Sequence, residues 1–432
     1  MRLTPKEAFN AALDPFVIEN DEATIGVAVS GGSDSIALLL LAHEWAKSTT
    51  FKICAATVDH GLRPEAKDET TYVAQVCGDL NVPHEVLNWA DWDGAGNLQA
   101  SARSARYELL DGWVLANDID VVLLGHTADD QVETFLMRLA RGSGVDGLAG
   151  MAQVQNDYFR PLLGVGREDL RAFLRERNVP WFDDPSNDDE RFDRVKARKM
   201  KDQLAELGLT QDRILRTVQH MENARRSLEH AAFEFAKTHV RGEVGDLLIP
   251  VRTFHGVSDD IAGRVVSGAV CWVGGTVFKP RYESLLDAAS RVSRGEARTL
   301  QGTLMKREGD VVRVSREVSA AKQVADVSLL AGDPQSEIVW DKRWGIRLSN
   351  PTHSRFGAKE WKPKTGQVTV KALGEHIKEV PDWRALGLPR ASLMATPAVF
   401  DGETLISAPV AGYNNGFEAR IVTDFSSFLL SR

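Results

Sequence analysis

The sequence has little cysteine and no long hydrophobic run. Only three of its 432 residues are cysteine (Cys54, Cys77 and Cys271), which excludes a disulfide framework and a Cys-x-x-Cys metal pair. The longest aliphatic run, Ile36–Ala42, is far shorter than the roughly 20 residues that cross a bilayer. The first 16 residues lack the apolar core of a secretory signal and carry two acidic side chains. These absences predict a cytoplasmic protein without a membrane span.

The chain also lacks a large excess of one charge, since its net charge is −9 and its apolar fraction of 43% is ordinary for a globular protein. Its length predicts two to four domains. The charge is unevenly distributed: residues 1–190 carry a net −17, whereas residues 191–432 carry +8. Because electrostatic fields act over about 8–10 Å, the basic part is able to attract nucleic acid, although a merely solvated surface would have the same composition.

Short apolar runs alternate with helical patterns over the first 180 residues. The runs are mainly apolar rather than alternating, which is typical of parallel strands buried on both faces. This predicts an α/β fold with a Rossmann-like parallel sheet covered by helices on both faces. A ligand crevice in such a sheet lies beyond the carboxyl ends of the strands. The predicted strands are 25–29, 51–58, 84–87 and 121–124, and the predicted helices are 34–47, 65–80, 98–116 and 128–141.

The composition changes after the acidic segment 181–190. Residues 191–226 predict one or two basic amphipathic helices, residues 227–315 an α-rich region that closes with a hairpin, and residues 317–330 a linker. Short β-type runs broken by glycine and proline follow. We therefore predict three domains: residues 1–215, an α-rich middle domain over 216–318, and a small α/β or β-rich domain over 330–432.

A loop rich in glycine and serine follows the first predicted strand. Glycines let backbone amides approach a ligand, and the amides at the start of the next helix point toward it, as in a phosphate or pyrophosphate cradle. Asp34 would repel phosphate unless Mg²⁺ lies between them, so we expect Asp34 to bind Mg²⁺. The alternative is a Gly-Gly turn in which Ser33 caps the helix. The loop residues are Ser30, Gly31, Gly32, Ser33, Asp34 and Ser35.

Acidic residues follow the fourth predicted strand. Thr127 is suited to cap the next helix, with Asp129 and Asp130 in its first turn. Asp130 and Glu133 share one face of that helix, where a carboxylate pair would bind Mg²⁺ or an ammonium group. A metal-dependent hydrolase that uses His126 is a further option, although the sequence shows no complete set of metal ligands.

Two other segments bear on the crevice. Asp59 and His60 follow the second predicted strand, so we expect them to face the phosphate loop. Residues 142–147 match the G-x-G-x-x-G pattern of dinucleotide-binding proteins but follow a helix rather than a strand. We therefore interpret them as a helix C-terminal cap and loop.

Several segments taken together carry a family resemblance: SGGSDS (30–35), VDHGLR (58–63), NLQASARSARY (97–107), GHTADDQVETFLMRLARGSGVDGLAGM (125–151), RPLL (160–163), DPSN (184–187) and VPDWRALGLPR (380–390). They resemble the N-type ATP pyrophosphatase, or PP-loop, family and, within it, the tRNA(Ile)-lysidine synthase family. The resemblance is strong over about residues 1–200 and weaker beyond. Two departures concern tRNA contacts rather than the nucleotide loop: Val195 stands where the family usually has asparagine, and Thr303 replaces a glycine of a frequent Gly-Gly pair.

The resemblance implies a two-step ligation. ATP adenylates the C2 carbonyl oxygen of the cytidine at the first anticodon position of tRNA(Ile) with a CAU anticodon, and pyrophosphate leaves. The ε-amine of free L-lysine then attacks C2 and expels AMP, which leaves lysidine and switches decoding from AUG to AUA. The implied co-substrate is ATP and the implied metal is Mg²⁺. The basic region would bind the tRNA. The resemblance implies no membrane, and it is compatible with a homodimer.

The resemblance also implies roles for individual residues. Asp34, Asp130, Glu133 and Arg106 would take part in catalysis. Asp130 or Glu133 would bind the ammonium group of lysine, with Asp129 as a further candidate, and Arg106 would steady phosphate or the activated base. The residues expected to bind ATP are 30–35, Asp59, His60 and His126, and those expected to contact substrate beside the carboxylates are Arg194 and Arg198.

Three other functions remain open. A PP-loop tRNA thiolase relies on cysteine chemistry, often with paired cysteines, and this chain has no Cys-x-x-Cys. An amidating synthetase fed by glutamine would need a glutaminase-like segment, which the sequence does not show. A regulatory or scaffolding module that only binds adenine nucleotide would need neither three polar loops at one crevice nor a basic second part.

Overall fold

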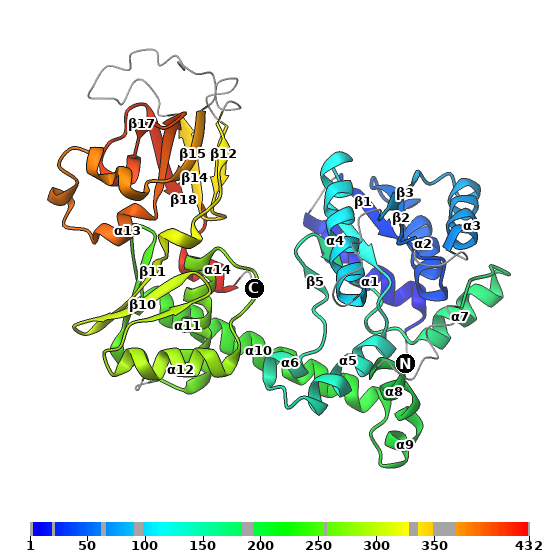
Figure 1. Cartoon of the computed structure of the whole chain (residues 1–432). Helices are drawn as coiled ribbons and strands as arrows, with labels where there is room; N and C mark the ends of the chain where they lie inside the picture. The colour runs from blue at the N-terminus through cyan, green and yellow to red at the C-terminus, as the bar shows by residue number, and fades with distance from the viewer. Residues whose placement is uncertain are drawn as a thin grey trace. The chain divides into compact units, whose positions relative to one another are not determined.

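The computed structural model of the chain describes residues 3–19, 22–61, 66–89, 98–183, 193–254, 257–327, 336–348 and 368–430 (Figure 1). The chain divides into two compact units, Met1–Arg225 and Arg226–Arg432. Their boundary lies inside helix α10 (Gln211–His239), and so does the predicted boundary after residue 215. The division into three domains stays a prediction. None of the described helices is long and apolar enough to span a membrane.

The first unit is built on a six-stranded sheet with the order β3-β2-β1-β4-β6-β5. All neighbouring strands pair in parallel except β5 and β6, which are antiparallel. The predicted parallel sheet is therefore confirmed, and each of the four predicted strands lies within one residue of its observed bounds. The strands are β1 (Thr24–Ala28), β2 (Lys52–Asp59), β3 (His84–Asn88), β4 (Val121–Leu124), β5 (Val154–Gln155) and β6 (Tyr158–Phe159).

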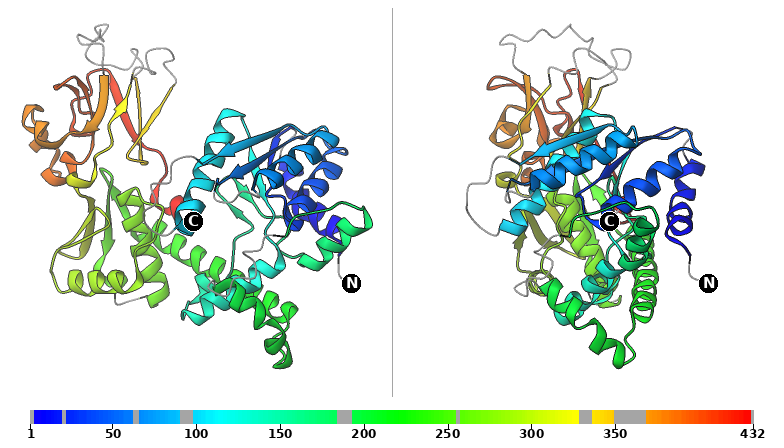
Figure 2. Two further views of the ribbon diagram at one scale, coloured as in Figure 1. Left: turned by 45° about the vertical axis from the view of Figure 1, so that its right-hand side comes forward. Right: turned by 90° about the vertical axis from the view of Figure 1, so that its right-hand side faces the viewer.

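Helices cover both faces of this sheet, as the two views in Figure 2 show. Alternate residues of β1 enter different apolar clusters: Ile25 and Val27 pack with α1, α2, α3 and α7, whereas Ala28 packs with α4. A Cβ atom at Gly26 would meet the Trp113 ring at 2.6 Å, so glycine at this position lets α4 approach the sheet closely. The helices are α1 (Pro5–Glu19), α2 (Ser33–Ala46), α3 (Ala66–Asp79), α4 (Leu98–Ala116) and α7 (Arg167–Glu176).

Further helices complete the first unit. The predicted basic helices are observed as α8 (Asp193–Lys199), α9 (Lys201–Glu206) and the start of α10. Val195, one of the two departures from the family pattern, is buried on α8. Helix α5 (Ala128–Ala140) packs against α10 through an apolar cluster that includes Val132 and Val218. Gly142, at a φ of +70°, follows the end of α5, so the G-x-G-x-x-G match begins at a helix C-terminus as predicted, and α6 (Val145–Leu148) lies within it.

The described part of the second unit contains three sheets. Two are β7-β8-β11-β10-β9 and β12-β15-β16-β17, and the third is β13-β14-β18; all of their strand pairs are antiparallel. The predicted closing hairpin is β10-β11, and Thr303, the other departure from the family pattern, is buried at its start. The strands are β7 (Arg241–Glu243), β8 (Asp246–Pro250), β9 (Arg298–Leu300), β10 (Thr303–Glu308), β11 (Val311–Arg316), β12 (Ala325–Asp326), β13 (Ile338–Trp340), β14 (Trp344–Leu348), β15 (Val368–Ala372), β16 (Pro397–Asp401), β17 (Thr404–Ser407) and β18 (Phe417–Ile421).

The middle region contains more strand than the single predicted hairpin, because β7, β8 and β9 extend that hairpin into a sheet. Strand β12 falls within the predicted linker 317–330 and pairs with β15, so this part of the segment belongs to a sheet. Arg63 and the DPSN segment at 184–187 lie outside the described residues. The helices are α11 (Asp259–Gly274), α12 (Tyr282–Ser293), α13 (Arg390–Met394) and α14 (Phe425–Leu430).

Candidate functional site

The predicted phosphate loop connects β1 to α2. Gly31 has a φ of +86°, a left-handed conformation that a side chain would strain. Its carbonyl accepts a hydrogen bond from the Phe182 amide at 3.0 Å, which ties the loop to a segment 150 residues away. Gly32, not Ser33, is the N-cap of α2, and no side chain caps the helix. The backbone at this helix start is therefore arranged as expected for an anion-binding turn.

The serines shape this loop from within. The Ser35 hydroxyl accepts a hydrogen bond from the Ser30 amide at 3.1 Å and donates to the Gly32 carbonyl at 3.0 Å. The end of β4 also lies close, because a Cβ atom at Gly125 would lie 3.2 Å from the carbonyl oxygen of Asp34. Glycine at that position lets the loop that follows β4 approach the phosphate loop.

Asp130 has two functions at the start of α5. Its Oδ2 atom accepts hydrogen bonds from the Thr127 amide at 2.8 Å and from the Thr127 hydroxyl at 2.9 Å, which completes a capping box. Its Oδ1 atom faces Arg167 Nη2 at 3.5 Å. Asp130 therefore fits both predictions for this segment, helix capping and a carboxylate at the crevice. One of its oxygens caps the helix while the other faces the crevice.

Arg167, at the first position of α7, connects the phosphate loop to helix α5. Its Nε donates to Asp34 Oδ2 at 2.9 Å, and its Nη1 lies 4.0 Å from Glu133 Oε1. Arg167 was not among the residues predicted from the sequence for this site. One local signal existed, since a positive side chain in the first turn of a helix opposes the helix dipole.

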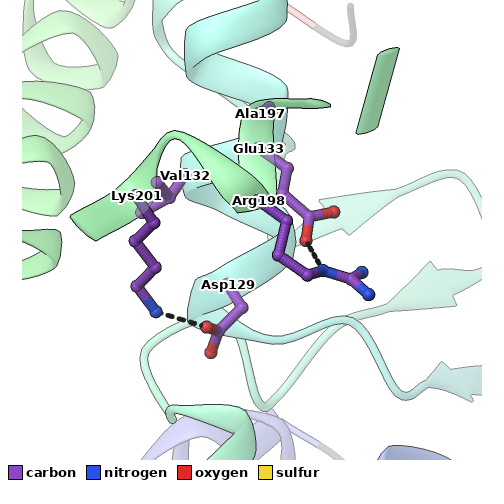
Figure 3. Close-up of a pocket in the computed structure, with 6 residues that line it drawn as sticks. All are labelled: Asp129, Val132, Glu133, Ala197, Arg198 and Lys201. Atoms are coloured by element: carbon purple, nitrogen blue, oxygen red, sulfur yellow. Dashed lines mark hydrogen bonds and ion pairs between the residues drawn. The ribbon is translucent and has the colours of Figure 1, made fainter. Parts of the chain in front are cut away.

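Asp129 is engaged by the protein on both oxygens. Its Oδ2 accepts the backbone N–H of Arg167 at 2.8 Å and the Gln211 side chain at 3.3 Å, and its Oδ1 accepts Lys201 Nζ at 2.7 Å (Figure 3). Burial acts to raise the pKa of Asp129, but these donors outweigh it and hold the pKa below its usual value. Lys201 is a second residue that the sequence analysis missed.

Asp34, Asp129, Asp130 and Glu133 form an acidic cluster. Glu133 is the most deeply buried of the four, with a side chain only 4% exposed. Its Oε1 accepts Arg198 Nε at 2.9 Å (Figure 3). Arg194 Nε lies 4.0 Å from Oε2. Oε2 has no hydrogen-bond partner among the described residues. Burial raises the pKa of Glu133, although Arg198 opposes that shift. A buried carboxylate oxygen without a donor suits a site that receives a cationic or proton-donating ligand.

The two predicted histidines lie within the electrostatic reach of Arg106. Burial lowers the pKa of His126 to about 4 and also lowers that of His60, and the Arg106 charge adds to both shifts. The Nδ1 atoms of both rings are buried without a hydrogen-bond partner in the described structure. Burial therefore favours the neutral form of both imidazoles. The Asp59 carboxylate accepts the Gly61 amide at 2.8 Å and so stabilises its own turn.

Among the described residues, the acids alone do not form a metal site. No group of three or more His, Cys, Asp or Glu arranged to hold a metal occurs among the described residues. Asp34 and Asp130 nevertheless present one oxygen each to the same guanidinium group. Mg²⁺ is commonly held by one or two carboxylates together with substrate phosphates, so this pair fits a metal that arrives with a nucleotide.

Known proteins match both the first part of this chain and most of its length. Residues 5–203 match the PP-loop domain family. The tRNA(Ile)-lysidine synthase of Ruegeria pomeroyi is 40% identical over 415 residues, which are 94% of each chain. That of Hyphomonas neptunium is 37% identical, with 77% of this chain and 94% of the relative covered. Among solved structures, U34-tRNA thiolase NcsA from Methanococcus maripaludis matches 50% of this chain and 78% of its own at 17% identity, with a TM-score of 0.44.

Proposed function

The chain belongs to the tRNA(Ile)-lysidine synthase family, tRNA-modifying enzymes with an ATP-binding PP-loop domain, and we propose that it ligates free L-lysine to a tRNA base. The base is the cytidine at the first anticodon position of tRNA(Ile) with a CAU anticodon. The observation that carries the proposal is that Arg167 touches both the phosphate loop, at Asp34, and the acids of α5, at Asp130. This contact supports the proposal that ATP activation and amine capture take place side by side.

In the first step, the C2 carbonyl oxygen of the cytidine attacks the α-phosphorus of ATP and the bond to pyrophosphate breaks. The loop 30–35 would hold the phosphates through backbone amides and hydroxyl groups. His60 and His126, whose burial lowers their pKa and favours the uncharged form, would contact the nucleoside. Arg106 would stabilise the negative charge that develops on the leaving group or on the activated base.

Asp34, with Asp130 beside it, would hold Mg²⁺, whose chemistry at this place is the neutralisation of phosphate charge. The protein supplies the surroundings for that ion. Burial raises the pKa of Asp34, and the Arg167 charge opposes the shift. The ionised form of Asp34 therefore depends on a cation beside it, which is Arg167 when no nucleotide is bound.

In the second step, the ε-amine of lysine attacks C2 and AMP leaves. That amine has an ordinary pKa of about 10.4, so it must lose a proton before it attacks. Glu133 is better placed than Asp130 to bind the ammonium group and take this proton, because Glu133 Oε2 has no hydrogen-bond donor among the described residues whereas both Asp130 oxygens have one. The raised pKa of Glu133 also favours proton acceptance.

The basic helices that follow the PP-loop domain supply the charge for tRNA. Residues 191–226 carry ten basic and five acidic side chains, which suits contact with the phosphates of an anticodon arm. Arg194 and Arg198 extend this charge to the edge of the acidic cluster. We place the reaction in the cytoplasm, where tRNA is modified, and a homodimer is compatible with it.

The test follows radiolabelled lysine into acid-insoluble RNA with the purified chain, ATP, Mg²⁺ and tRNA(Ile) bearing a CAU anticodon. Methionine tRNAs with the same anticodon serve as controls. We expect label in the isoleucine tRNA alone, and none with Asp34→Ala. ATP cleavage without lysine transfer would contradict the ligation and return attention to the thiolase and amidating reactions.

A further inference from the structure

We propose that Arg167 is a placeholder cation. In the nucleotide-free protein it neutralises Asp34 and Asp130; when the metal–nucleotide complex binds, it releases Asp34 and contacts the phosphates that leave as pyrophosphate. This inference rests on the proposed function for the identity of the nucleotide, but its principal test needs neither tRNA nor lysine.

The first step of the argument is charge. The side chains of Asp34, Asp130 and Glu133 are only 19%, 12% and 4% exposed, and each has an oxygen within 4.0 Å of the Arg167 guanidinium. Buried carboxylates this close repel one another unless a cation lies between them. Arg198 donates a 2.9 Å hydrogen bond to Glu133, and Arg167 donates a hydrogen bond of the same length to Asp34. Arg167 therefore already occupies the place of a cation between the phosphate loop and α5.

The second step is competition for one atom. Asp34 Oδ2 accepts the Nε–H of Arg167 at 2.9 Å, and Asp34 Oδ1 accepts the Ser33 hydroxyl at 3.1 Å. A metal ion bound to Oδ2 would repel the guanidinium group and take its place. The carboxylate thus exchanges one cation for another, without an intermediate state in which it is buried and uncompensated.

The third step is the position of the released side chain. The Arg167 backbone is fixed by its own N–H, which donates to Asp129 Oδ2, and Asp129 is held in turn by Lys201. The guanidinium therefore turns about a fixed point beside the phosphate loop. Its planar set of donors matches phosphate oxygens better than a single ammonium group does. Asp129 acts in this scheme as a positioning residue rather than as a ligand of the substrate lysine.

The test measures Mn²⁺ binding by the loss of the free-ion EPR signal, with no nucleotide present. Arg167→Met should bind one Mn²⁺ at least about tenfold more tightly than the wild type, because its carboxylates have lost their cation. Arg167→Lys, which keeps the charge, and Arg175→Met, a surface change on the same helix, should match the wild type. Adding Asp34→Asn to Arg167→Met should remove the gain. Equal Mn²⁺ affinity of the wild type and Arg167→Met would overturn the proposal.

A second measurement addresses the phosphate contact. A non-hydrolysable ATP analogue with Mg²⁺ should bind Arg167→Met at least about tenfold more weakly than it binds Arg175→Met, and equal affinities would overturn this part. If Arg167→Met does not fold, Arg167→Gln replaces it in both measurements, with the same expected and contradicting results. Lysine transfer by the wild type tests the proposed function separately, so the two failures are distinguishable.

Discussion

Glu133 accepts a hydrogen bond from Arg198 on one carboxylate oxygen, at 2.9 Å, while its other oxygen has no hydrogen-bond partner among the described residues. The contact joins α5 of the PP-loop sheet to α8, the first of the basic helices. A single carboxylate thus links the nucleotide site to the region that we propose binds tRNA. Its other oxygen, which Arg194 approaches at 4.0 Å without a hydrogen bond, is where we propose that a cationic substrate binds.

Glu133→Gln should reduce lysine transfer more than ATP activation. The amide keeps the shape of the side chain but loses the negative charge and the ability to accept a proton. Losing one buried charge-assisted hydrogen bond costs about 1.5–3 kcal/mol, so we expect kcat/KM for lysine to fall about 10–100-fold. Pyrophosphate exchange into ATP should change less than about threefold. The measurement is labelled-lysine incorporation beside pyrophosphate exchange.

The matched control for that variant is Glu168→Gln on α7, whose carboxylate pairs with Arg171 and is exposed. It should leave both reactions unchanged. A Glu133→Gln enzyme with a normal KM and kcat for lysine would show that Glu133 does not contact this substrate.

Gly31→Ala should weaken nucleotide binding through backbone strain alone. A Cβ atom at this position would meet nothing closer than 3.6 Å, so the effect comes from the φ of +86° and not from a clash. Left-handed backbone costs a residue with a Cβ atom about 1–2 kcal/mol, which corresponds to an increase of about 5–30-fold in the Kd of an ATP analogue if the loop distorts. The measurement is calorimetric titration of the analogue.

Gly78→Ala is the control for this change, because Gly78 lies in helix α3 with nothing within 4 Å of its added Cβ atom. It should bind the analogue normally and be slightly more stable, since alanine favours helix. Normal affinity in Gly31→Ala would exclude the loop conformation as a requirement for binding.

Much of the first unit could be predicted because its signals are local. Mainly apolar runs identify four of the five parallel strands to within one residue, and two glycines after the first strand indicate the loop that we predict binds phosphate. Arg167 could not be found in this way, because its hydrogen bond to Asp34 spans 133 residues and depends on how α7 packs against the sheet. Lys201 meets Asp129 across 72 residues for a similar reason.

The second unit was less predictable because its strands are short and carry weaker patterns. Strands β7 and β9 have three residues each, too few for an alternating pattern to show. They are stabilised by pairing with the longer hairpin β10-β11 and its neighbour β8, which is a tertiary effect. The sequence therefore revealed the hairpin but not the sheet that forms around it.

His126 should remain neutral in the folded protein at pH values far below the pKa of an ordinary histidine. Burial lowers its pKa to about 4, whereas an unfolded chain titrates near about 6.5. Between these values the unfolded chain binds more protons, so the free energy of unfolding should fall as pH is lowered from about 6.5 to 4, by about 1–3 kcal/mol. His126→Gln should lose this dependence. NMR titration of the His126 ring, assigned by that variant, measures the pKa directly.

The outcome that would contradict this prediction is a His126 ring that titrates near pH 6.5. His220→Gln, which removes an exposed imidazole from α10, controls for the general effect of losing a histidine. A charged His126 at neutral pH would also argue against its contact with an uncharged nucleoside.

In the second unit, Asp246 is a buried carboxylate on β8. Its Oδ2 accepts Arg313 Nη1 at 3.0 Å and the Ser392 hydroxyl, so it connects the five-stranded sheet to α13. Burial raises its pKa to about 6 despite these donors. The folded state therefore binds more protons than the unfolded chain between about pH 4 and 6. The contribution of Asp246 to the free energy of unfolding consequently decreases as the pH rises through that window.

Asp246→Asn should remove this decrease in the free energy of unfolding with rising pH. Because the amide resembles the protonated acid, the variant should be close to the wild type in stability near pH 4 and become relatively more stable toward pH 7.5, by up to about 3 kcal/mol. Urea unfolding of both chains at pH 4.5, 5.5, 6.5 and 7.5 measures the difference, with the exposed Asp382→Asn as the control. A difference that does not change with pH would mean that Asp246 is ionised throughout, so that Arg313 and Ser392 outweigh its burial.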